Sequence, residues 1–288
     1  MSVLYVVGTP VGNLDDLSPR GTEILRSADL IIAEDTRTAM KLCQVFDIHA
    51  RLESCHRHNE RTKAAYLAEE IITKDISAAL TTDAGTPCIS DPGYELVREC
   101  IDRGITVIPV PGCCAAVAAL SVCGFDVREF TFFGFLPREK KDLAQKLKEI
   151  GREGRAAVIY ESPFRIMQLV ETVCLVLPSA ELAVCCDLTK IHEKIIYGAP
   201  DKVLSELKSN DKTEKGEYCV VLKPGQEPNE LGDQEQPEGM SDEALLVNYM
   251  KEGLSLREAQ ERLVAEGKKK NAVKQAALNL KKMFEVEI

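Results

Sequence analysis

The segment Thr82-Asp83-Ala84-Gly85-Thr86-Pro87-Cys88-Ile89-Ser90-Asp91-Pro92-Gly93 follows directly on the apolar residues 76–80. It contains so many turn formers that the strand predicted over residues 76–80 must end before it. Its glycines allow sharp turns and let the backbone come close to a bound molecule. Asp91 before Pro92 is typical of an N-cap followed by the first helical position, so we expect a helix to begin at Pro92. Taken alone, the loop also fits an ordinary connection between a strand and a helix.

Two further loops of this kind follow predicted strands. Residues 3–7 form an apolar strand that is broken by Gly8-Thr9-Pro10-Val11-Gly12-Asn13-Leu14, and residues 105–110 lead into Pro111-Gly112-Cys113-Cys114-Ala115-Ala116. In open parallel sheets the ligand crevice lies beyond the carboxyl ends of the strands. We therefore expect the three loops to line one site. The alternative for the last loop is an Ala-rich helix packed closely on a sheet.

Strand and helix alternate through the first half of the chain. A short strand at residues 30–33 follows a helix near residues 19–27, and Leu67, Ile71 and Ile72 mark one face of a helix before the strand at 76–80. Such alternation with short connections predicts a parallel sheet that is covered by helices on both faces.

The second half predicts a different sheet. Strands are expected at residues 130–135, 156–160, 182–186, 194–197 and 218–222, with fewer helices between them, so this sheet should be mixed. A charged helix is expected at residues 138–150. Another should open at Pro163 and carry apolar residues on one side, namely Ile166, Leu169, Val170 and Val173.

The expected organisation is α/β throughout, with a small helical module at the end. We place an N-terminal α/β domain at residues 1–125, a second α/β domain at 126–225, an acidic linker at 226–240 and a three-helix module at 241–288. The module's helices lie near residues 242–251, 256–266 and 271–283, divided by Gly253 and Gly267.

Charge is unevenly distributed along a chain whose formal net charge is -10. The acidic total argues against a protein that simply coats nucleic acid. The last helix nevertheless carries Lys268, Lys269, Lys270 and Lys274, which we interpret as a phosphate-facing patch. A solvated helix face is the alternative.

Composition favours a soluble cytoplasmic protein. No apolar run approaches the roughly 20 residues of a membrane span, and no basic segment with an apolar stretch precedes the first strand. The 11 cysteines are an odd number without a CxxC pair, which suits free thiols in a reducing compartment.

Other cofactor classes lack their motifs. The loop at residues 8–12 does not have the GxGxxG spacing of a dinucleotide fold, and the chain contains no GxxxxGK[ST] sequence. His56 and His58 match no zinc pattern, so we expect no metal.

Several motifs together resemble the ribosomal RNA small-subunit methyltransferase I family of the tetrapyrrole methylase superfamily. The resemblance spans nearly the whole chain and rests on the loops at residues 4–14 and 83–93 and on Ala33-Glu34-Asp35-Thr36-Arg37, His58-Asn59-Glu60, Gly134-Phe135-Leu136-Pro137, Tyr160-Glu161-Ser162-Pro163-Phe164-Arg165, Leu188-Thr189-Lys190 and Lys215-Gly216-Glu217. It implies S-adenosyl-L-methionine as methyl donor and the 2′-hydroxyl of a cytidine in 16S ribosomal RNA as acceptor. It also implies a homodimer that acts on this RNA or on the assembled 30S subunit.

The resemblance further implies which residues touch the donor. In the first domain these are Pro10, Val11, Asp83, Ala84, Gly85, Ile89, Ala115 and Ala116, and in the second they are Tyr160 and Gly216.

A sugar hydroxyl is a poor nucleophile at neutral pH, so a group that accepts its proton should help the transfer. The candidates are Lys190, His58, Glu60 and Glu193. Arg37 and Arg165 are expected to hold phosphates. The alternatives are an ion pair beside a helix cap for Arg37 and a solvated side chain for Lys190.

The chain departs from the family pattern at two places. Cys113 stands where members usually carry Pro, and Cys186-Asp187 stand where they carry Arg-Glu, so substrate details could differ. Two other functions stay open at this point: methylation of a tetrapyrrole carbon, for which a basic tail has no use, and RNA binding without catalysis.

Overall fold

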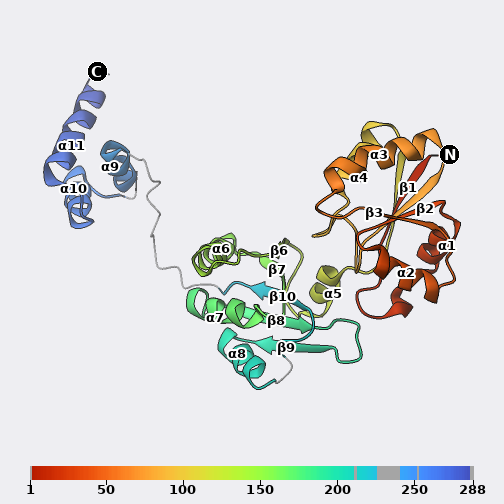
Figure 1. The fold of residues 1–288 in the computed structure, drawn as a ribbon. Helices are drawn as coiled ribbons and strands as arrows, with labels where there is room; N and C mark the ends of the chain where they lie inside the picture. The colour runs from red at the N-terminus through yellow and green to blue at the C-terminus, as the bar shows by residue number, and fades with distance from the viewer. Residues whose placement is uncertain (1, 211–212, 226–240, 252, 286–288) are drawn as a thin grey trace. The chain divides into compact units, whose positions relative to one another are not determined.

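The computed structural model describes residues 2–210, 213–225, 241–251 and 253–285. The chain divides into two compact units, Met1–Gln226 and Glu227–Ile288. Figure 1 shows the first unit as two sheets with their helices and the second as a group of helices. The expected linker at residues 226–240 lies outside the described residues.

The first sheet is parallel, as predicted. Its order is β3-β2-β4-β1-β5, so β1 lies between β4 and β5. The strands are β1 (Val3–Val7), β2 (Leu30–Ala33), β3 (Arg51–Ser54), β4 (Ser77–Thr81) and β5 (Thr106–Val110), and the helices of this half are α1 (Pro19–Ser27), α2 (Thr36–Val45), α3 (Glu60–Thr73), α4 (Tyr94–Asp102) and α5 (Ala115–Val122), with a short 3-10 helix η1 (Leu14–Asp16).

Apolar clusters cover both faces of this sheet, which confirms the predicted layers. Leu67 and Leu96, from α3 and α4, pack with Leu4 and Leu80 of the strands on one face. Leu25 of α1 packs with Val7 and Ile31 on the other. The buried aliphatic side chains supply the main favourable term for folding this half.

The second sheet is mixed, again as predicted. Its order is β6-β7-β10-β8-β9, in which β6 and β7 are parallel and the other neighbours antiparallel. The strands are β6 (Phe130–Phe135), β7 (Ala156–Glu161), β8 (Glu181–Cys186), β9 (Lys194–Gly198) and β10 (Tyr218–Lys223), and the helices are α6 (Lys140–Glu153), α7 (Ile166–Val176) and α8 (Pro200–Lys208).

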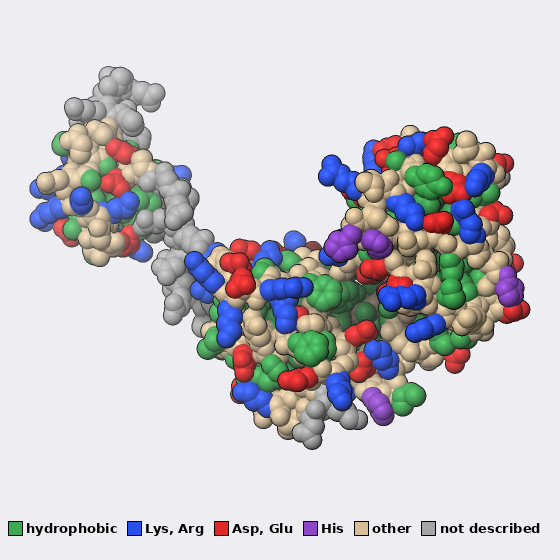
Figure 2. Space-filling model, in the orientation of Figure 1, with side chains coloured by type: hydrophobic (Ala, Val, Ile, Leu, Met, Phe, Trp, Pro, Cys, Tyr) green, Lys and Arg blue, Asp and Glu red, His purple; other side chains and the backbone are tan. Residues whose placement is uncertain are grey.

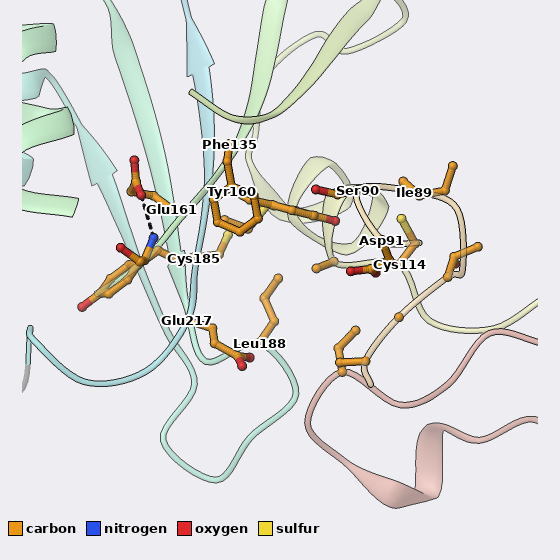
Figure 3. A pocket seen from close by; sticks show the side chains of 18 of the residues that line it. Ile89, Ser90, Asp91, Cys114, Phe135, Tyr160, Glu161, Cys185, Leu188 and Glu217 are labelled. Atoms are coloured by element: carbon orange, nitrogen blue, oxygen red, sulfur yellow. Dashed lines mark hydrogen bonds between the residues drawn. The ribbon is translucent and has the colours of Figure 1, made fainter. Parts of the chain in front are cut away.

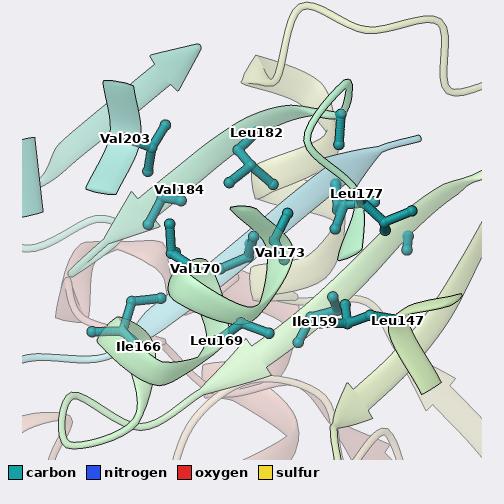
Figure 4. Close-up of a cluster of buried hydrophobic side chains, with 14 of the residues drawn as sticks. Leu147, Ile159, Ile166, Leu169, Val170, Val173, Leu177, Leu182, Val184 and Val203 are labelled. Atoms are coloured by element: carbon teal, nitrogen blue, oxygen red, sulfur yellow. The ribbon is translucent and has the colours of Figure 1, made fainter. Parts of the chain in front are cut away.

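Its two faces pack against different elements. Ile166, Leu169, Val170 and Val173 of α7 are buried against one face, together with residues of α6 and α8 (Figure 4). Ala116, Ala119 and Leu120 of α5 pack on the other face. Helix α5 therefore leads from the third loop of the first sheet straight onto the second sheet.

Three local predictions were wrong. Helix α4 begins at Tyr94 with Gly93 as its N-cap at φ 129°, so neither Asp91 nor Pro92 opens it. Helix α7 begins at Ile166, and Pro163 lies in the preceding turn. Ile72 is 38% exposed, because α3 buries the face that carries Leu67 and Ile71.

The second unit consists of α9 (Asp242–Lys251), α10 (Leu256–Ala265) and α11 (Lys270–Glu285), close to the predicted ranges. Leu246, Leu263 and Val273 belong to its apolar core. Gly253 and Gly267 end the first two helices with φ of 96° and 94°. In the described residues of both units no helix combines the length and apolarity needed to cross a membrane.

Candidate active site

The loops after β1, β4 and β5 meet at one edge of the first sheet. The loops after β1 and β4 exchange two backbone hydrogen bonds, in which Thr9 N–H donates to Gly85 O at 2.8 Å and Gly85 N–H donates to Thr9 O at 3.1 Å. The Thr86 hydroxyl donates to Cys113 O in the third loop at 2.9 Å. The register of β1 between β4 and β5 thus brings together segments some 30 to 100 residues apart in sequence.

Two glycines permit this convergence. A Cβ on Gly112 would lie 2.6 Å from Gly8 O, and one on Gly8 would lie 2.8 Å from Gly112 Cα. Both contacts are with backbone, so no side-chain rotation could relieve them. The first and third loops can therefore touch only where both residues lack a side chain.

The second sheet forms the facing wall of a cavity of about 360 Å³. This size lies within the roughly 300–1,000 Å³ of small-molecule sites. Figure 3 shows Asp91 and Cys114 on one side of the pocket and Glu161 on the far side, with Tyr160 between them. The lining residues are Val11, Ala84, Gly85, Thr86, Ile89, Ser90, Asp91, Cys114, Ala115, Phe135, Tyr160, Glu161, Ser162, Pro163, Cys185, Leu188, Glu217, Tyr218 and Cys219.

Tyr160 ties the two sheets together inside the cavity. Its hydroxyl accepts a hydrogen bond of 3.1 Å from Ala116 N–H at the start of α5. Burial raises the pKa of this phenol, so it stays neutral at physiological pH. The rings of Phe132 and Phe135 pack edge-on against it, with centroids 5.1 Å and 6.0 Å away.

The charged side chains among the lining residues are all acidic, although Glu161 and Glu217 each pair with a cation outside the lining. Asp91, Glu161 and Glu217 are among its lining residues, and no Lys or Arg of the described part of the chain is. Figure 2 shows a hollow in this unit with hydrophobic side chains inside it and acidic ones beside it. A cavity of this kind favours a positively charged ligand and disfavours phosphate groups.

The family model described as Tetrapyrrole (Corrin/Porphyrin) Methylases matches residues 3–202. The chain belongs to this family. Residues 3–202 include the three loops and Tyr160.

Named relatives agree with this family, and a solved structure agrees with the fold. The methylase is 40% identical to a protein of Escherichia coli O157:H7 over 96% of this chain and 94% of the relative, and 36% identical to one of Bacillus subtilis over 90% and 88%. Both relatives are named Ribosomal RNA small subunit methyltransferase I. A crystal structure of diphthine synthase, 16% identical, aligns with a TM-score of 0.59 over 77% of this chain and 90% of that one, and supports the fold alone.

The structure brings together six of the residues expected to touch the donor. These are Val11, Ala84, Gly85, Ile89, Ala115 and Tyr160, which all line the cavity. Ala116 reaches it through the N–H bound to Tyr160. Pro10 and Asp83 line a different pocket, between the first loop and α2. Gly216 stands beside Glu217, and Asp187 occupies the space where its Cβ would point, 2.5 Å away.

Among the expected proton acceptors, Lys190 is an ion-paired cation. Its Nζ lies 2.8 Å from Asp187 Oδ1 and 3.1 Å from Glu217 Oε2. Burial lowers its pKa, but the two carboxylates outweigh that effect and raise the pKa above the ordinary lysine value. A base needs the neutral amine, so these contacts argue against Lys190 in that role. Asp187, which belongs to the Cys186-Asp187 departure from the family pattern, is thus one of the two partners of Lys190.

The other expected acceptors also lie outside the cavity lining. Glu60 is buried and its Oε1 accepts hydrogen bonds from Gly93 N–H at 2.7 Å and Glu95 N–H at 2.9 Å, which caps α4. His58 is exposed, with its ring 6.1 Å from that of His56. Glu193 is exposed and accepts from Thr189 N–H.

The expected phosphate contacts differ in accessibility. Arg37 is 88% exposed in its side chain and pairs with Asp35 at 2.6 Å, the N-cap of α2. Arg165 is 19% exposed, and it pairs with Glu161 at 3.1 Å and donates to Leu136 O and Pro137 O. These bonds direct the Arg165 guanidinium to the protein's own groups. In the second unit Lys269, Lys270 and Lys274 are exposed, while Lys268 pairs with Asp242 at 3.1 Å.

Sequence reasoning missed the chemistry of Asp91 and Phe135. Asp91 was expected as a helix cap, yet its carboxyl lines the cavity. Phe135 was quoted only as part of a motif, yet it is 59% exposed at the pocket. The available signal for Asp91 was its place in the second loop, since polar residues beyond strand ends are where parallel sheets place their chemistry.

Proposed function

We propose that this methylase transfers a methyl group from S-adenosyl-L-methionine to the 2′-hydroxyl of a cytidine in 16S ribosomal RNA. The observation that carries the proposal is the cavity in which the three loops of the first sheet meet the Tyr160 wall. The names of the relatives supply the RNA substrate, and the resemblance of the motifs supplies the ribose hydroxyl and the cytidine.

The cavity fits the donor in charge and shape. The sulfonium of the donor supplies the electrophilic methyl group, and its positive charge suits a lining with carboxyls and without Lys or Arg. Gly85, at φ 86°, presents backbone to the cavity in a conformation that other residues rarely adopt. The chain's contribution is to hold donor and acceptor in line, since proximity and orientation dominate such transfers.

Aromatic side chains at the cavity suit an unstacked base. Phe135 lines the cavity and is 59% exposed, and Phe164, 80% exposed, follows the lining residue Pro163. Enzymes that modify single nucleotides take them out of the helical stack and hold the base against aromatic side chains. Phe135 is the better candidate because Tyr160 supports its ring from the side.

The second unit supports an RNA substrate over a tetrapyrrole. Lys269, Lys270 and Lys274 are exposed near the start of α11, and basic side chains of this kind bind phosphates of RNA. A small macrocycle gives no reason to carry them. We further propose that the protein is cytoplasmic, as ribosomal RNA requires, and that it forms the homodimer implied by the resemblance; sedimentation equilibrium tests the dimer, which a purely monomeric mass would refute.

The deciding experiment is transfer of tritiated methyl from S-adenosyl-L-methionine to purified 30S subunits and, separately, to protein-free 16S RNA. Alkaline hydrolysis follows, because a 2′-O-methyl group blocks cleavage of the next phosphodiester bond and leaves the label in a dinucleotide. Label in an alkali-resistant dinucleotide that contains cytidine supports the proposal. Label in mononucleotides would indicate base methylation, and donor binding without transfer would favour the non-catalytic RNA-binding factor.

A further inference from the structure

The titratable groups that line the cavity are the candidates for a proton acceptor. Glu161 is 3% exposed, accepts from Ser162 N–H at 2.8 Å and pairs with Arg165. The Glu217 side chain is 72% exposed and paired with Lys190. Burial keeps the phenol of Tyr160 protonated. Glu161 and Glu217 are thus paired with cations, and Tyr160 carries no charge.

Asp91 differs from Glu161 and Glu217 because no cation in the described part of the chain pairs with it. Among the described residues no Lys, Arg or His lies within ion-pair distance of its carboxyl. Arg57, whose charge lowers the pKa of Asp91, donates its hydrogen bond to the backbone oxygen of Ser90 at 3.2 Å. Asp91 is thus a half-buried carboxyl in the wall of a cavity, left without a counter-ion.

The groups that face Asp91 come from several elements. They are Glu34 after β2, Arg57 after β3, Thr82, Asp83 and Cys88 of its own loop, and Tyr160 of β7. Burial, followed by the charge of Glu34, raises the pKa of Asp91 to about 6, while a hydrogen bond with Thr82 opposes the rise. A carboxyl tuned in this way is ionised at neutral pH and still basic enough to hold a proton during a reaction.

The surrounding loop holds Asp91 in place at a cost in backbone strain. Cys88 and Ser90 adopt φ of 69° and 71°, which are uncommon for residues other than glycine. Arg57 donates to Ser90 O, and Glu60 accepts from Gly93 N–H, so residues just before α3 and at its start fix both sides of Asp91. Strained and braced backbone of this kind clusters at functional sites.

We propose that the Asp91 carboxylate is the general base that accepts the proton of the acceptor hydroxyl. The inference rests on the proposed function. As the 2′-oxygen forms its bond to the methyl carbon, the bond between that carbon and sulfur breaks and its electron pair stays on the sulfur. The hydroxyl proton passes to an Asp91 carboxylate oxygen, and Asp91 later returns it to solvent.

The test compares Asp91→Asn with Asp102→Asn, a change of the same charge on the exposed part of α4, where Asp102 pairs with Arg98. Methyl transfer to RNA should fall by about 10²- to 10⁴-fold in kcat for Asp91→Asn and stay unchanged for Asp102→Asn. The wild-type rate should rise with pH through an apparent pKa near 6, and the remaining rate of Asp91→Asn should lack that step. Formate should restore part of the rate to Asp91→Ala.

A second readout needs no catalysis. A raised pKa means that the folded protein binds the Asp91 proton more tightly than the unfolded chain does, so ionisation penalises folding as pH rises from about 4 to about 6. Asp91→Asn should therefore raise Tm at pH 8, and the gain should shrink towards pH 4. Calorimetry should show that Asp91→Asn still binds S-adenosyl-L-methionine, with only a modest rise in the dissociation constant from the loss of one carboxylate charge in the cavity.

The outcomes distinguish failure of the proposed function from failure of the Asp91 assignment. If wild-type protein binds the donor but methylates no RNA, the proposed function fails and the assignment of Asp91 fails with it. If wild-type protein is active and Asp91→Asn keeps its kcat and its pH profile, only the assignment of Asp91 is wrong. Loss of donor binding in Asp91→Asn would also overturn it, because Asp91 would then be a donor ligand.

Discussion

Glu60 provides the sharpest test of how the second loop is built. The Glu60 carboxylate is 8% exposed and accepts from two N–H groups at the start of α4, both through Oε1. Hydrogen bonds to a charged group contribute about 1.5–3 kcal/mol each, and bonds that share one oxygen are not additive. Glu60→Ala should therefore lower the free energy of unfolding by about 3 kcal/mol, which for a unit of this size shifts Tm by roughly 6–12 °C.

Glu60→Gln separates capping from catalysis. The amide oxygen can still accept from both Gly93 and Glu95, so only the charge at the helix N-terminus is lost, worth about 1 kcal/mol or roughly 2–4 °C in Tm. The rate of methyl transfer should change by only a few-fold. A general base replaced by Gln would lose about 10²- to 10⁴-fold instead.

Thermal unfolding by circular dichroism, together with single-turnover methyl transfer, measures both effects. Glu69→Ala is the matched control, because Glu69 lies on the same helix α3 with its side chain 59% exposed and paired with Arg103 at 2.8 Å. Such a surface pair contributes about 0–1 kcal/mol. A Glu60→Gln protein with normal Tm and no activity would refute the capping role and restore Glu60 as a catalytic candidate.

Further predictions concern the donor, the base and the RNA. Gly85→Val should weaken S-adenosyl-L-methionine binding strongly, because Gly85 has φ 86° and a β-branched residue there is strained; an unchanged dissociation constant in calorimetry would contradict this. Phe135→Ala should raise KM for RNA about 10-fold or more without changing donor affinity, whereas Phe130→Ala, at the other end of β6, should not, and equal effects would remove the stacking role. Reversing the charges of Lys269 and Lys274 should weaken RNA binding and flatten its dependence on salt, measured by filter binding; an unaltered slope would mean that α11 does not contact RNA.

The fold followed from the sequence where apolar periodicity was strong. The ranges of β1, β2, α1 and α9 agree with prediction to the residue, because each is bounded by turn formers or caps. Element β3 was missed because Arg51–Ser54 is polar and carries no strand pattern. The start of α4 was misjudged because its cap is supplied by Glu60, more than 30 residues away, and no local motif records such a partner.

The sequence predicted only the part of the site that is formed by the backbone of the loops. Turn-rich loops after parallel strands predict a shared edge, and Val11, Gly85 and Ala115 do meet there. Side-chain roles were harder, because they depend on partners from distant segments. The sequence suggests Lys190 as a base, but the structure pairs it with Asp187 and Glu217. The sequence suggests Asp91 as a helix cap, but in the structure it lines the cavity.

The central claim is that the methyl donor sits among the three loops and against the Tyr160 wall. A crystal structure with S-adenosyl-L-homocysteine, the spent donor, tests it most directly. The account predicts the ligand between Gly85, Ala115 and Tyr160, with its sulfur facing the open part of the cavity near Asp91. A ligand bound instead in the pocket of Pro10 and Asp83 beside α2, with the Tyr160 cavity empty, would contradict it.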